Sequence, residues 1–143
     1  MKKKSKKHCL YFYLIIVTKC FSQNSDIITN NIWFFDSMTT ITKAKREKIT
    51  ILYKDEKNFE SLTFKKPNIL EYYVINDGFE HTGLAKWNLK KDNLRIISGQ
   101  DTIKSILKIE DNILSIVTYD KEPKTNYGYT TIIKYNTKPK KSE

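Results

Sequence analysis

Short apolar runs separated by turn-forming clusters fill the stretch from Lys86 to Asp120. The clusters are rich in Asn, Asp and Gly, which tolerate left-handed backbone angles. They are Lys91-Asp92-Asn93, Ser98-Gly99-Gln100-Asp101 and Glu110-Asp111-Asn112. Before the first cluster Trp87 and Leu89 alternate with polar residues, as a sheet with one buried face requires. Leu94 and Ile96 continue the alternation after it, so the stretch predicts an antiparallel meander.

The same stretch has a competing helical interpretation. With Asp101 as a candidate cap, six aliphatic residues fall near helical spacing: Ile103, Ile106, Leu107, Ile113, Leu114 and Val117. We favour strands because β-branched residues are abundant and because Glu110-Asp111-Asn112 interrupts the pattern.

Further strands are expected on both sides of the meander. They are Ile32 onward, Ile49–Tyr53, Ser61–Phe64, Ile69–Ile75 and Tyr127–Asn136. Residues 23–31 are expected to form a polar arm, and residues 76–83 a long loop. In the first strand, alternation predicts one face with Trp33, Phe35, Ser37 and Thr39 and another with Phe34, Asp36 and Met38.

The count is eight or nine strands, with no helix longer than two turns and no linker that would divide the chain. Evenly spaced strands of this kind suit a closed up-and-down barrel, which leaves no exposed edge. The sequence therefore predicts an all-β fold with a single domain over residues 23–143, ending in a basic tail.

The first 22 residues have the form of a secretory signal peptide. Met1–Lys7 is basic, Cys9–Thr18 is apolar, and small residues at 20 and 22 precede a cleavage site before Gln23. The apolar run is about half of the ~20 residues needed to span a bilayer. We therefore expect an exported protein, periplasmic or secreted, whose mature form has no transmembrane segment.

Acylation of Cys20 as a lipoprotein anchor would need a small residue before the cysteine, but Lys19 stands there. Simple export is the favoured interpretation. Both cysteines lie in residues 1–22, so the domain itself has no disulfide and no thiol nucleophile.

Export also changes the charge of the protein. Six of the 26 basic residues and none of the 16 acidic ones lie in residues 1–22, so cleavage lowers the net charge from +10 to +4. Much of the remaining excess is lysine near the C-terminus, and only Arg46 and Arg95 could make bidentate contacts to phosphate or guanine. Nucleic-acid binding is therefore not expected.

Few residues could support catalysis or bind a metal. His81 is the single histidine after residue 22, which excludes a multi-histidine zinc site. Asp77, Glu80 and His81 are close in sequence, but we interpret them as a solvated loop. The adjacent acids Glu110 and Asp111 fit turn chemistry, and four scattered glycines form no phosphate loop. We expect a protein that is not an enzyme and carries no cofactor or metal.

Five motifs resemble those of the small bacterial lipocalin-like domains, which are exported calycin-type barrels. The motifs are the Trp33 strand, Leu62-Thr63-Phe64, the Lys86–Ile96 run, the Ile106–Leu114 hairpin and Thr131-x-Ile133-x-Tyr135. They span residues 32–137. The resemblance implies a small β-barrel able to carry a ligand.

An eight-stranded barrel either fills its interior with side chains or holds one small ligand. The aromatic residues expected to face inward, and so to contact a small apolar or amphipathic ligand, are Trp33, Phe35, Phe64, Tyr72, Trp87, Tyr129 and Tyr135. The alternative is a non-enzymatic protein-interaction module of the cell envelope with a filled barrel core. Its motivation is a set of outward apolar residues, Phe34, Ile69, Tyr73 and Ile97.

Overall fold

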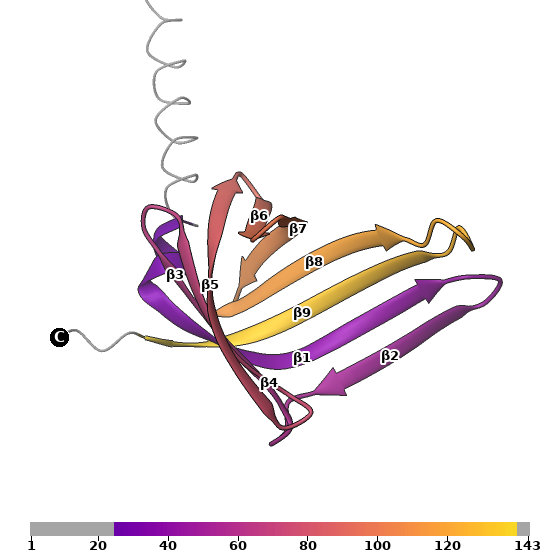
Figure 1. Cartoon of the computed structure of the whole chain (residues 1–143), viewed down its shortest axis with the longest axis horizontal. Coiled ribbons are helices and arrows are strands. Elements are labelled where there is room, and N and C mark those ends of the chain that lie inside the picture. The colour runs from indigo at the N-terminus through magenta and orange to yellow at the C-terminus, as the bar shows by residue number, and fades with distance from the viewer. Residues whose placement is uncertain (1–24, 140–143) are drawn as a thin grey trace, which may run out of the picture.

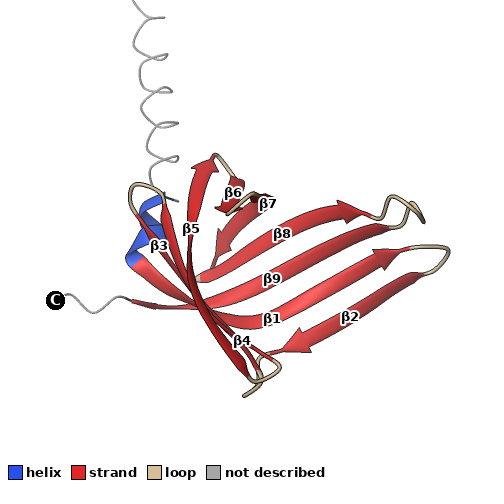
Figure 2. Ribbon diagram, in the orientation of Figure 1, coloured by secondary structure: helices blue, strands red, loops and turns tan. Residues whose placement is uncertain are grey.

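The computed structural model describes residues 25–139, which fold into one antiparallel sheet of nine strands after a short helix at residues 25–30 (Figure 2). The strands are β1 (Asn31–Lys43), β2 (Glu47–Tyr53), β3 (Asn58–Lys65), β4 (Ile69–Asn76), β5 (Phe79–Lys90), β6 (Asn93–Ser98), β7 (Asp101–Glu110), β8 (Ile113–Lys121) and β9 (Gly128–Pro139). The all-β prediction is confirmed. The predicted signal peptide and the last residues of the basic tail lie outside the described residues.

Eight of the strands close into a barrel. β3 to β9 follow one another as a meander, and β1 completes the circle by pairing with both β3 and β9 (Figure 1). The two contacts are unequal, because β1 pairs with β3 only at Trp33–Leu62 and Phe34–Ser61 but pairs with β9 over its whole length. The predicted closure of an up-and-down barrel is therefore confirmed.

The ninth strand, β2, lies outside the barrel. It pairs with the second half of β1, from Ser37 to Lys43, and all seven of its residues are exposed. The far ends of β8, β9 and β1 continue past the barrel with β2 as an arm that we call the projecting sheet (Figure 1). The structure thus keeps one free edge strand, which full closure would have removed.

The turns explain why the meander forms. Asp111 and Asn112, between β7 and β8, both have positive φ, as a two-residue hairpin of type I′ requires. The strand interpretation of this region is therefore confirmed over the helical one. The expected long loop at residues 76–83 is wrong. Asp77 and Gly78 (φ 50° and 82°) make a second tight turn, and β5 begins at Phe79.

A bulge in β1 corrects the predicted faces of this strand. Asp36 is an extra residue, because Phe35 pairs with Tyr135 while Ser37 already pairs with Lys134. A bulge reverses the alternation that follows it. Trp33 and Phe35 face inward as predicted. Beyond the bulge Met38 packs against the core, so the prediction that Ser37 and Thr39 share the face of Trp33 and Phe35 is wrong, although Ser37 is itself buried.

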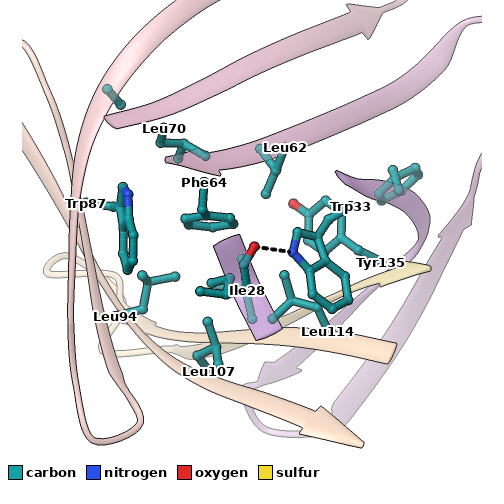
Figure 3. Packing of buried hydrophobic residues seen from close by; sticks show 13 residues of the cluster. Ile28, Trp33, Leu62, Phe64, Leu70, Trp87, Leu94, Leu107, Leu114 and Tyr135 are labelled. Carbon is teal, nitrogen blue, oxygen red and sulfur yellow. Dashed lines mark hydrogen bonds between the residues drawn. The ribbon is translucent and has the colours of Figure 1, made fainter. Parts of the chain in front are cut away.

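One end of the barrel is packed solid. The expected polar arm is instead the helix at residues 25–30, and its Ile28 is fully buried in the barrel end (Figure 3). The Nε1–H of Trp33 donates to the backbone oxygen of Ile28 at 3.0 Å. Beside it Phe64 and Trp87 meet edge to face, with ring centroids 5.3 Å apart. We call this region the packed end.

Candidate functional site

The other half of the barrel is hollow. It holds a cavity of about 320 Å³ whose fourteen lining residues come from the seven strands β3 to β9. Eight of these residues are aliphatic, and the polar ones are Glu60, Tyr72, Ser98, Ser105, Thr118 and Tyr135. Strand alternation produces this lining, because each strand turns every second side chain toward the barrel axis. The result is an apolar chamber with a few fixed polar groups.

Glu60 contributes the one carboxyl group among these lining residues. The hydroxyl of Tyr135 donates to its Oε2 at 3.2 Å. Burial raises the pKa of Glu60 above the ordinary carboxyl value, and the hydrogen bond from Tyr135 opposes this change. Burial and the neighbouring Glu60 together raise the pKa of Tyr135 well above its ordinary value, so its hydroxyl remains a donor at neutral pH.

Glu60 also lies where the cavity meets a second, smaller pocket. This pocket of about 130 Å³ shares Glu60, Val74 and Ile133 with the cavity. Met38 and Leu52 line it from the projecting sheet. Glu60 therefore lines both spaces.

Two contacts shape the cavity wall. The ring of Tyr72 lies against Gly83, its partner across β4 and β5, where a Cβ atom would overlap the Tyr72 hydroxyl and ring. Glycine therefore lets the ring lie along the wall. On the other side of the cavity the hydroxyl groups of Ser105 and Thr118 form a hydrogen bond, with their oxygen atoms 2.9 Å apart. This bond lies beyond Ile106–Val117, the last pair of residues that joins the backbones of β7 and β8.

The predicted inward aromatics separate into three groups. Trp33, Phe64 and Trp87 fill the packed end, and Phe35 lies between it and the smaller pocket. Tyr72 and Tyr135 line the cavity. Tyr129 lies opposite Thr42 in the projecting sheet, away from the cavity lining. The structure therefore brings only two of the seven residues to the hollow half.

Glu60 and Gly83 are two residues of the cavity region that are not among the predicted site residues. Glu60 alternates with Leu62 and Phe64, both buried, so the period of β3 already places it on the inward face. Gly83 falls within the predicted loop at residues 76–83, but it lies inside β5, and a glycine inside a strand often marks a close approach to another group. The strand pattern was the available signal in both cases.

A larger hollow of about 550 Å³ is lined by residues of β5, β6, β7 and β8. Its rim carries three exposed cations, Lys90, Arg95 and Lys104, and the exposed Tyr119. Solvated lysines are weak determinants of a specific site. The inner cavity is therefore the better candidate.

The residues considered for metal binding do not converge. Asp77 is in the turn, whereas Glu80 and His81 are successive residues of β5 and project to opposite faces. Between residues 25 and 139 no group of three His, Cys, Asp or Glu side chains is placed to hold a metal ion.

The fold and the cavity define the class: an eight-stranded antiparallel β-barrel with one packed end and one hollow half. No protein-family model matches the chain, and its sequence matches no curated protein. None of the helices in the described part of the chain is long and apolar enough to cross a membrane.

The raised pKa of Glu60 predicts a pH-dependent stability. The folded chain binds more protons than the unfolded chain once the pH passes the ordinary carboxyl value. The stability contributed by this group is therefore fully present at low pH and is lost as the pH rises through the folded-state pKa. Glu60→Gln should raise the free energy of unfolding by about 1 kcal/mol at pH 7.

Urea unfolding at pH 7 and at pH 4 measures this effect. The gain from Glu60→Gln should disappear at pH 4, where the native carboxyl is already protonated. Glu110→Gln, at an exposed position at the end of β7, is the matched control and should change little at either pH. An equal effect of Glu60→Gln at both pH values would contradict the raised pKa of Glu60.

Proposed function

We propose that this protein is a non-enzymatic, exported, lipocalin-like barrel that binds a small apolar or amphipathic molecule in its cavity. The closed eight-stranded meander supports the lipocalin-like part of the proposal. The form of residues 1–22 supports export.

The cavity is the observation that carries the proposed function. Its volume of about 320 Å³ is within the usual range for small-molecule sites, about 300 to 1,000 Å³. Aliphatic walls with a few convergent polar groups are typical of such sites. Burial of an apolar ligand would contribute roughly 25 cal/mol for each Å² removed from water.

The same cavity argues against the alternative of an interaction module with a filled barrel. The large aromatic side chains crowd the packed end and leave the other half hollow. The outward apolar residues also fall into two separate groups. Phe34 and Tyr73 each pack against Phe59, whereas Ile69 and Ile97 lie on either side of Lys86. They do not support a single docking surface.

A fluorescent apolar probe tests the proposal. Titration with N-phenyl-1-naphthylamine should give saturable binding. Val74→Trp, which places a large ring where the cavity meets the smaller pocket, should weaken this binding at least about tenfold. Leu84→Trp adds the same ring on the outer face of β5 and should leave binding unchanged. Absence of saturable binding, or equal binding by the Val74→Trp variant, would refute the proposal.

A further inference from the structure

The charge inside the barrel is opposite to the charge of the whole chain. The chain has 26 basic and 16 acidic residues. Yet the described residues that line the cavity and the smaller pocket include no lysine or arginine, and their one acid is Glu60. An amphiphile that enters the barrel therefore meets a negative group without a compensating cation.

The polar partners of Glu60 are incomplete. An ionised carboxylate can accept about four hydrogen bonds. Within residues 25–139 the Glu60 side chain receives one, from the Tyr135 hydroxyl. Tyr135 is almost fully buried and meets Phe35 edge to face, so this donor is held in place. The carboxylate keeps acceptor capacity for a ligand.

The surroundings of Glu60 suit a positively charged head group. Asn58 and Asn76 face each other across β3 and β4 and line the smaller pocket beside Glu60. Their amide oxygens can accept hydrogen bonds from an ammonium group. Leu70, Ala85 and Ile96 lie on the cavity side, where an alkyl chain would extend.

We propose that the barrel selects amphiphiles with a protonated amine head, which pairs with the Glu60 carboxylate while the apolar chain occupies the aliphatic cavity. This inference rests on the proposed function, because it assigns a chemical class to the ligand of the same cavity. An opposite charge inside the barrel is strongly attractive where the effective dielectric constant is low. A fatty-acid anion meets repulsion from the same carboxylate.

Three ligands with one chain length test the selection. Decylamine, 1-decanol and decanoate are each used at pH 7 to displace N-phenyl-1-naphthylamine from the wild-type protein. Decylamine should bind at least about tenfold more tightly than decanoate, with 1-decanol between them. Glu60→Gln should abolish the advantage of decylamine over 1-decanol, so that the two ligands bind this variant with similar affinity.

Glu110→Gln is the matched control and should keep the wild-type order of affinities, because this carboxylate lies outside the cavity lining. Binding of decanoate as tightly as decylamine, or an amine preference that survives Glu60→Gln, would overturn the inference and leave ligand binding in place. If neither the probe nor any of the three ligands binds, the proposed function itself fails.

Discussion

Replacement of Trp33 by alanine is expected to lower the free energy of unfolding by about 4 kcal/mol. Trp33 is completely buried and lies in one of only two residue pairs that join β1 to β3. Its removal leaves a large cavity at the packed end and takes the hydrogen-bond donor from the Ile28 carbonyl. Both losses weaken the closure of the barrel. Urea unfolding with linear extrapolation measures the difference.

Two further variants separate the contributions. Trp33→Phe keeps most of the ring volume but loses the Nε1–H donor, and it should cost about 1 to 2 kcal/mol. Tyr119→Ala removes an aromatic ring that is 63% exposed, and it should change stability by less than about 0.5 kcal/mol. If Trp33→Ala lowers the free energy of unfolding no more than Tyr119→Ala does, the tight packing of Trp33 in the packed end is contradicted.

Replacement of Gly83 by alanine is expected to cost about 2 kcal/mol, because the new Cβ overlaps the ring of Tyr72. In a Tyr72→Ala background the overlap is absent. The same replacement should then be neutral or slightly stabilising, since alanine loses less conformational freedom in a strand than glycine. The two positions should therefore be coupled in a double-mutant cycle measured by urea unfolding.

Gly128→Ala is the matched control for this cycle. The nearest heavy atom to a Cβ at Gly128 is Lys43 Cβ at 3.8 Å, an ordinary van der Waals distance. The replacement should therefore be tolerated in both backgrounds. If the effects at Gly83 and Tyr72 are simply additive, the close contact with Tyr72 is not what requires a glycine there.

Most of the strands could be predicted from the sequence because their signals are local. Trp87 and Leu89 alternate with polar residues, and the Asp111-Asn112 pair fits the positive φ values of its turn. Local alternation did not predict the bulge at Asp36, because the extra residue of a bulge has no local signature. The burial of Ile28 was not predicted either, because a helix of six residues is stable only when it packs against the rest of the fold, here against the end of the barrel.

The sequence by itself determined which segments are strands and where they turn, since alternation and turn chemistry act over two to four residues. Only the tertiary structure decided which inward side chains pack solid and which surround a cavity. Glu60 and Tyr135 are 75 residues apart and meet because β1 joins β3 to β9. Closure of the barrel turns side chains from strands that are far apart in sequence toward a common axis. The volumes of these side chains then decide which part of the interior is filled and which part stays hollow.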